Sequence, residues 1–154
     1  MTRTAFALVA FGCLLLATGI AGSADTTMKP VLVLPANVHW VAGTGEAKGT
    51  YSALVAGNPG KPGIYVMLIK VPAGWSEQPH FHATDEYATV IKGNVLVGFG
   101  DTFDKASMKS MPPGSVGVIP KGMHHYAMAT TEAIFEVFGM GPVTQTYVHG
   151  GGSM

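Results

Sequence analysis

The stretch 74–93, GWSEQPHFHATDEYATVIKG, decides how this chain is interpreted. It places two histidines one residue apart, His80 and His82, and a glutamate, Glu86, four residues further on. Alternate residues of a strand point to the same face, so both histidines would face one side, and a short turn would bring Glu86 back beside them. Two imidazoles and a carboxylate on one concave surface suit a divalent transition metal. The alternative is a polar surface loop, but this spacing on expected strands favours a metal site.

A second stretch, PKGMHH at residues 120–125, offers a further ligand about forty residues later. It contains His124 and His125, so four of the six histidines of the chain lie in the two stretches. Adjacent residues of a strand point to opposite faces, and only one of this pair should therefore reach the metal. The local pattern leaves open which one does.

The chain beyond residue 25 predicts an all-β sandwich or barrel. Short runs of β-branched and aromatic residues are separated by Gly and Pro about every eight to twelve residues, and no amphipathic helix is evident. Residues 92–94, Lys-Gly-Asn, have the composition of a hairpin turn that would pair the strands on either side. The clearest expected strands are 51–56, 64–71, 80–82, 86–91, 95–99, 115–119, 125–130, 133–138 and 144–148.

With these stretches placed on strands, the sequence resembles the cupins, a family of small β-barrels with two short motifs. The first motif, Gly-x5-His-x-His-x3–4-Glu-x6-Gly, is matched without a gap by Gly74, His80, His82, Glu86 and Gly93. The second, Gly-x5-Pro-x-Gly-x2-His-x3-Asn, is matched by Gly114, Pro120, Gly122 and His125, but its final Asn is replaced by Ala129. That Asn is not a metal ligand in the family, so the departure removes a local polar contact and leaves the metal inference standing.

The resemblance implies a single RmlC-like jelly-roll β-barrel that holds one divalent transition metal (Mn, Fe, Ni, Cu or Zn). It implies that the ligands are His80, His82, Glu86 and His125, with His124 outside the pocket or at its rim. Family analogy also suggests a homodimer. Because the ligands bind in their deprotonated forms, metal affinity should fall below about pH 6.

Two functions follow from different classes. In the first, the protein is a metal-dependent enzyme acting on an oxygen-rich small molecule, as a dioxygenase or as an isomerase or lyase. In the second, it is a non-catalytic protein that binds a metal or a small ligand, and the sequence leaves this choice open. Glu136, in the apolar run AIFEVFG, is a candidate general base, because buried acids are rare unless paired; it could equally point outward.

The two ends of the chain are interpreted separately from the expected barrel at residues 25–149. Residues 1–24 combine one positive charge at Arg3, an apolar run and a small-residue exit, which predicts a secretory signal peptide and a periplasmic or secreted protein without a membrane anchor after cleavage. Residues 150–154, GGGSM, are expected to be a flexible tail. The remaining eight lysines and nine acids form no basic patch, which argues against nucleic acid as a partner.

Overall fold

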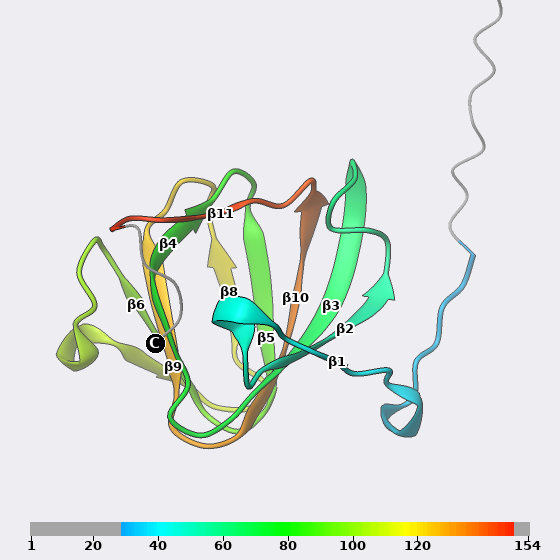
Figure 1. Ribbon diagram of the computed structural model, residues 1–154, viewed down its shortest axis with the longest axis horizontal. Coiled ribbons are helices and arrows are strands. Elements are labelled where there is room, and N and C mark those ends of the chain that lie inside the picture. The colour runs from blue at the N-terminus through cyan, green and yellow to red at the C-terminus, as the bar shows by residue number, and fades with distance from the viewer. Residues whose placement is uncertain (1–28, 150–154) are drawn as a thin grey trace, which may run out of the picture. The chain divides into compact units, whose positions relative to one another are not determined.

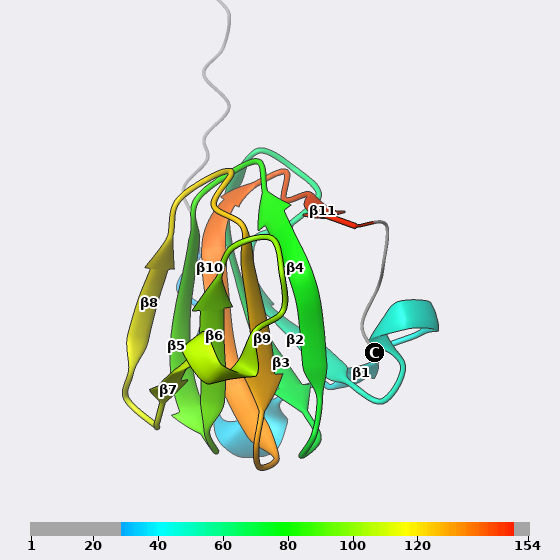
Figure 2. The ribbon, with the colours of Figure 1, turned by 90° about the vertical axis from the view of Figure 1, so that its left-hand side faces the viewer.

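Two antiparallel sheets face each other in the computed structural model, which describes residues 29–149 (Figures 1 and 2). The chain divides into two units, Met1–Pro30 and Val31–Met154, and both sheets belong to the second. The larger sheet has the order β1 (Val41–Ala42), β2 (Tyr51–Ala56), β3 (Gly63–Val71), β10 (Ala133–Gly141), β5 (Glu86–Lys92) and β8 (Val116–Ile119). The smaller has the order β11 (Gln145–Tyr147), β4 (Ser76–His82), β9 (His125–Ala129), β6 (Val95–Phe99) and β7 (Lys109–Met111).

The expected all-β fold is confirmed. Residues 29–149 contain these eleven strands and three single-turn 3-10 helices, at Pro35–Asn37, Gly45–Ala47 and Lys105–Ser107, and no α-helix. None of their helical segments has the length and hydrophobicity needed to cross a bilayer. The expected signal peptide (1–24) and tail (150–154) lie outside the described residues.

Alternation along the central strands gives the larger sheet its two faces. On β3, Met67 and Ile69 line a cavity between the sheets, and their partners on β10 are Val137 and Phe135, which line it too. The residues between them point to the outer face, as the two-residue period of a strand requires. The inner face of this sheet is therefore apolar along β3 and β10 at these positions.

The hydrophobic core lies at one end of the space between the sheets. Its fully buried members are Val71, Val90, Val95, Ala129 and Ala133, with Trp75 and Phe135 packed against them. On β5, Val90 belongs to this core, whereas Glu86 lies four residues earlier along the same inner face, about 13 Å away in an extended strand. The barrel thus has an apolar end and a polar end.

The expected hairpin at residues 92–94 is wrong. β5 pairs with β10 and β8, whereas β6 pairs with β7 and β9 in the other sheet, so the chain crosses between sheets at this point. Gly93 adopts a positive φ of 79°, and a Cβ there would overlap the Glu132 carbonyl oxygen. Asn94 is bound to the loop between β9 and β10 through the Thr130 and Thr131 hydroxyls. Close packing of two chain crossings, and not a hairpin, explains the glycine.

Candidate metal centre

Two histidines of the candidate site come from β4. His80 and His82 are 2% and 8% exposed, and both line the cavity between the sheets. The Nδ1 atom of His80 lies 2.8 Å from the Gln78 carbonyl oxygen, and that of His82 lies 2.8 Å from the Thr144 carbonyl oxygen. A carbonyl oxygen can only accept, so each Nδ1 carries a proton, and Nε2 is the ring nitrogen that remains available to a ligand or to Glu86. This is the arrangement that orients a histidine for metal binding.

The third histidine comes from β9, the neighbour of β4. His125 is the direct pairing partner of His80, is 3% exposed, and donates from Nδ1 to the Met123 carbonyl oxygen at 3.0 Å. One ring nitrogen from each of His80, His82 and His125 lies within 4.8 Å of the others. The smaller sheet therefore gathers three imidazoles whose Nδ1 atoms are already bonded to the backbone.

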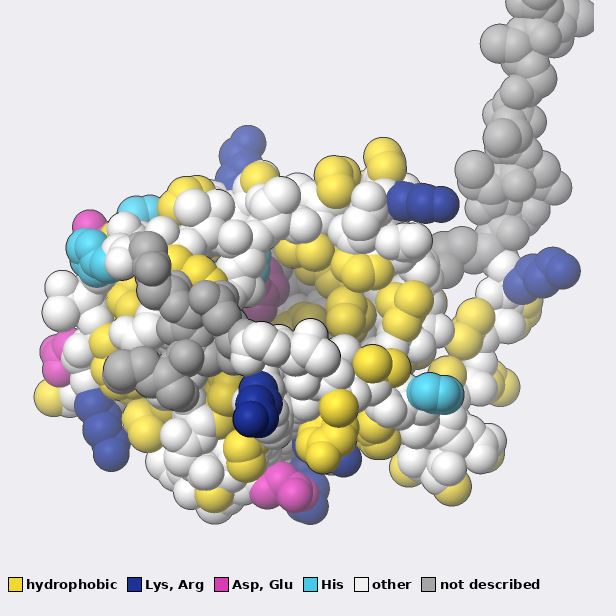
Figure 3. Space-filling model, viewed as in Figure 1, with side chains coloured by type: hydrophobic (Ala, Val, Ile, Leu, Met, Phe, Trp, Pro, Cys, Tyr) yellow, Lys and Arg dark blue, Asp and Glu magenta, His cyan; other side chains and the backbone are white. Residues whose placement is uncertain are grey.

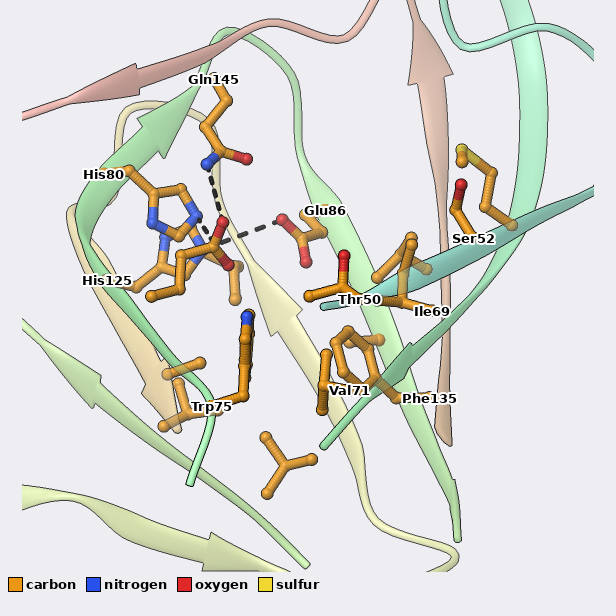
Figure 4. Close-up of a pocket in the computed structure, with 18 of the residues that line it drawn as sticks. Thr50, Ser52, Ile69, Val71, Trp75, His80, Glu86, His125, Phe135 and Gln145 are labelled. Carbon is orange, nitrogen blue, oxygen red and sulfur yellow. Dashed lines mark hydrogen bonds and ion pairs between the residues drawn. The ribbon is translucent and has the colours of Figure 1, made fainter. Parts of the chain in front are cut away.

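The candidate carboxylate comes from the opposite sheet. Glu86, the first residue of β5, places Oε2 2.6 Å from His82 Nε2 and 3.8 Å from His125 Nε2 (Figure 4). Both His82 Nε2 and an ionised Glu86 are acceptors in this arrangement, so a contact of 2.6 Å requires a proton between them. A cation at the same position could take the place of that proton.

The electrostatics of the four groups agree with this description. Burial lowers the pKa of His80 and of His125, which favours their neutral forms. Burial also acts to lower the pKa of His82, but the hydrogen bond and negative charge of Glu86 outweigh it and raise that pKa. The same pairing lowers the pKa of Glu86 against the effect of its own burial. Three imidazole nitrogens and one carboxylate oxygen form a donor set that fits a divalent transition metal.

His124 lies on the other side of the strand. Its Nδ1 atom is 2.6 Å from Asp101 Oδ1, and its ring stacks on Phe81 with a centroid separation of 5.0 Å and an angle of 24°. About a third of the side chain is exposed. The structure thus brings His125, and not His124, together with His80 and His82.

Glu136 does not line the cavity. Its neighbours on β10, Phe135 and Val137, point inward, so strand alternation places Glu136 on the outer face of the larger sheet. The structure therefore separates this candidate general base from the histidine cluster.

Glu77 is a cavity residue that sequence reasoning missed. It precedes His80 by three positions, and regular alternation would place the two on opposite faces. A bulge intervenes, because Glu77 pairs with Ala127 and His80 with His125, so three steps along β4 correspond to two along β9. Both side chains consequently line the cavity, and Glu77 Oε2 lies 4.0 Å from His80 Nε2.

Gln145 on β11 holds Glu77 in place. Its Nε2 atom donates to Glu77 Oε1 and to the Tyr147 hydroxyl, both at 2.8 Å. β11 reaches this position because the chain after β10 crosses to the smaller sheet, where β11 pairs with β4 (Figure 1). Burial raises the pKa of Glu77, against the opposing effect of the Gln145 hydrogen bond. Only the position of Glu77 inside the first motif could have drawn attention to it.

The cavity next to these groups has a volume of about 330 Å³. Its polar end is formed by the three histidines, Glu77, Glu86 and Gln145, and most of the remaining wall is apolar. Figure 4 shows Trp75, Val71 and Phe135 together below the polar groups, with Thr50 and Ser52 to one side. The space-filling view shows a hollow with histidine and acidic side chains at depth and hydrophobic side chains along its wall (Figure 3).

Comparison with known proteins agrees with this architecture. The family model described as Cupin matches residues 61–148, more than half of the chain, and the chain belongs to the cupin family. Germin-like protein subfamily 3 member 2 of Arabidopsis thaliana is 34% identical over 89 residues, which cover 57% of this chain and 35% of that protein. The chain thus spans about a third of the length of the curated relatives it matches.

Two solved structures share the fold. A candidate acetylacetone dioxygenase from Methylibium petroleiphilum superposes with a TM-score of 0.62 at 20% identity, covering 83% of this chain and 88% of its own. The polyketide cyclase RemF from Streptomyces resistomycificus superposes with a TM-score of 0.60 at 22% identity, covering 80% and 88%. At this level of identity the two neighbours establish the jelly-roll fold and not the reaction.

Proposed function

We propose that this protein is an exported, metal-dependent cupin enzyme that acts on an oxygen-rich small molecule in a dioxygenase-type reaction. The proposed metal ligands are His80, His82, Glu86 and His125. The observation that carries the proposal is the opening of this donor set directly onto an apolar cavity of about 330 Å³. A site that only stored a metal would not need such a cavity beside it.

Different residues would hold the metal, orient its ligands and exclude water. A divalent metal bound here would supply a Lewis acid for substrate oxygens and, if redox-active, a centre for dioxygen chemistry. The Gln78, Thr144 and Met123 carbonyls fix the three imidazoles in one tautomer and orientation. The apolar wall excludes bulk water from the reacting groups, which strengthens electrostatic interactions within the cavity.

The test is oxygen consumption by protein loaded separately with Mn, Fe, Ni, Cu and Zn. With pentane-2,4-dione or a flavonol as substrate, we expect at least one redox-active metal to support uptake and incorporation of both oxygen atoms into organic products. His82→Ala should abolish the uptake, whereas His39→Ala, at an exposed position away from the cavity, should not. A native protein that contains only Zn, or loaded protein without uptake on any oxygen-rich substrate, would favour the non-catalytic binding function instead.

Export is part of the proposal and is tested on the protein itself. We expect the protein recovered from the periplasm or medium of its own host to begin at residue 24 or 25, as determined by intact mass. A full-length chain retained in the cytosol would contradict this.

The proposal also includes a homodimer formed through the outer face of the larger sheet. Four apolar side chains on this face, Ile64, Met140, Val116 and Val118, are each more than half exposed. Burial of such a patch against a second copy would remove it from water. Light scattering coupled to size exclusion should give a dimer for the wild type and a monomer for Val118→Lys. A monomeric mass for the wild type would refute the dimer.

A further inference from the structure

Among the described residues that line the cavity, the one side chain that can act as a cation is His82, and its charge is already paired with Glu86. Of the residues that the structure describes, those lining it include two acids, Glu77 and Glu86, but no lysine or arginine. Lys70 points instead to the outer face of the larger sheet, where its Nζ lies 4.6 Å from the ring centroids of Trp40 and Tyr51. A ligand carboxylate that entered the metal-loaded cavity would therefore have only the metal as a counter-charge, while Glu77 and Glu86 would both repel it.

Most hydrogen-bond donors at the polar end are already bonded within the protein. Gln145 uses its amide nitrogen for Glu77 and for the Tyr147 hydroxyl. Each of the three histidines uses Nδ1 for a backbone carbonyl. The Trp75 ring turns its nitrogen toward the polar groups and is a neutral donor (Figure 4). This donor and the Tyr65 hydroxyl, which also lines the cavity, can bind a carbonyl or hydroxyl oxygen, but neutral donors do not neutralise a carboxylate.

Glu77 is positioned to bind a ligand. Gln145 fixes Oε1, which leaves Oε2 on the side of His80, 4.0 Å from its Nε2 atom. An oxygen in this place offers an acceptor to a hydroxyl group of a molecule whose other oxygens face the histidines. The remaining wall suits an apolar body, because Trp75, just before β4, and Phe135, on β10, both line the cavity with ring centroids 6.1 Å apart.

Resting on the function proposed above, we propose that the substrate is a neutral, largely apolar molecule with a hydroxyl group beside a carbonyl or second hydroxyl, and that Glu77 selects it. An enolised diketone or an ortho-substituted phenol belongs to this class. Carboxylic acids of the same shape are excluded, because Glu77 faces them where a binding site for acids would place a cation. The volume of about 330 Å³ lies at the lower end of the range for small-ligand pockets, roughly 300–1,000 Å³.

The test compares two probes of nearly equal shape, 2-hydroxyacetophenone and salicylate, which differ in a neutral acetyl group against a carboxylate. Their affinities for the Zn²⁺-loaded protein are measured by calorimetry, since Zn²⁺ supports no oxidation. We expect the neutral probe to bind at least tenfold more tightly. Equal binding, preference for salicylate, or binding of neither probe by metal-loaded protein would overturn the substrate class.

Glu77→Gln tests the selecting residue. We expect the preference to fall at least fivefold, mainly through tighter salicylate binding, while Zn²⁺ affinity stays unchanged. Glu132→Gln is the matched control, because it removes the same charge from an exposed site outside the cavity, and it should leave the preference intact. Lost Zn²⁺ affinity with an unchanged preference would make Glu77 a metal ligand and refute its selecting role. If Glu77→Gln does not fold, Gln145→Leu is the second variant. It removes the hydrogen bond that fixes Glu77 Oε1, so Oε2 is no longer held in place, and the preference for the neutral probe should also fall.

The two proposals fail in different ways. If the wild-type protein does not bind a divalent metal at all, the proposed function is wrong before any probe is added. If it binds the metal but prefers salicylate, the metal centre stands and the inferred substrate class does not.

Discussion

His125 and Tyr126 follow one another on β9 and are buried almost equally, with 3% and 1% of their surfaces exposed, but their polar atoms are used differently. The Tyr126 hydroxyl lies 2.8 Å from Ser107 Oγ and donates to the Asp104 carbonyl oxygen at 3.2 Å. His125 donates only from Nδ1, to Met123, and its Nε2 atom faces Glu86 across the cavity at 3.8 Å.

Burial alone therefore does not identify a functional residue on this strand. On the outward face of β9, the Tyr126 hydroxyl anchors the loop that contains residues 104–107. The inward face keeps a lone pair of His125 available for a ligand. The two faces should accordingly respond to mutation in different observables, namely stability for the outward face and metal affinity for the inward face.

The largest expected effect is on metal affinity at the inward face. His125→Ala should weaken metal binding at least about 100-fold, since mutation of groups that merely support ligands already costs roughly 10–100-fold. His124→Ala removes the adjacent histidine, whose Nδ1 pairs with Asp101 outside the cavity, and should change affinity by less than about threefold. Competition with a chelator of known affinity measures both. Similar losses in the two variants would contradict the assignment of the faces.

The next effect is on stability at the outward face. Gly98 pairs with Tyr126 across β6 and β9, and a Cβ at Gly98 would overlap the Tyr126 ring. Gly98→Ala should therefore lower the free energy of unfolding by about 3 kcal/mol, because a rigid buried ring cannot move aside. In Gly117→Ala, the matched control, the new methyl would meet only the flexible Met111 side chain at 3.4 Å. Urea unfolding should show a change within about 0.5 kcal/mol for the control.

A third effect distinguishes the inward face by its titration. The Glu86 hydrogen bond and charge raise the pKa of His82 above 6.5, so His82 holds its proton to a higher pH than a free imidazole until a metal displaces it. Metal affinity should thus rise about tenfold per pH unit from about pH 6.5 up to that raised pKa. Glu86→Gln removes the cause of the shift and should flatten the slope as well as weaken binding. An unchanged slope in Glu86→Gln would show that another group releases the proton.

Much of this contrast follows from short-range rules in the sequence. The spacing of His80 and His82, and the opposite faces of His124 and His125, depend only on the two-residue period of a strand. The family motifs then identified the inward histidine of that pair. Where the chain is a regular strand, the local pattern predicted which residues share a face, and the motif spacing was needed to choose between the two faces.

The features that the sequence did not predict depend on how distant segments pack. Glu77 enters the cavity because of a bulge in β4, and no local signal marks the residue at which a strand slips against its partner. Residues 92–94 have the composition of a hairpin turn, but Gly93 packs closely against Glu132 where the chain crosses between the sheets. The three-residue strand β7, Lys109–Met111, exists because β6 offers it an edge, and its sequence has no strand pattern of its own.

The smallest effect isolates the hydrogen bonds of Tyr126 from its bulk. Tyr126→Phe keeps the ring against Gly98 but removes the hydroxyl that binds Ser107 and Asp104, which should cost about 1 kcal/mol of unfolding free energy. Tyr87→Phe is the control. Tyr87 stacks on Phe138 at a centroid distance of 5.0 Å, and among the described residues its hydroxyl makes no hydrogen bond.

Neither tyrosine variant should change metal affinity, because neither hydroxyl faces the cavity. This makes Tyr126→Phe the sharpest test of the division between the two faces of β9. His125 directly precedes Tyr126 on β9, so any coupling between anchoring of the loop and orientation of the His125 ring would appear in this variant first. A metal affinity that fell together with stability would show that residues 104–107 position His125, and that the two faces act as one unit.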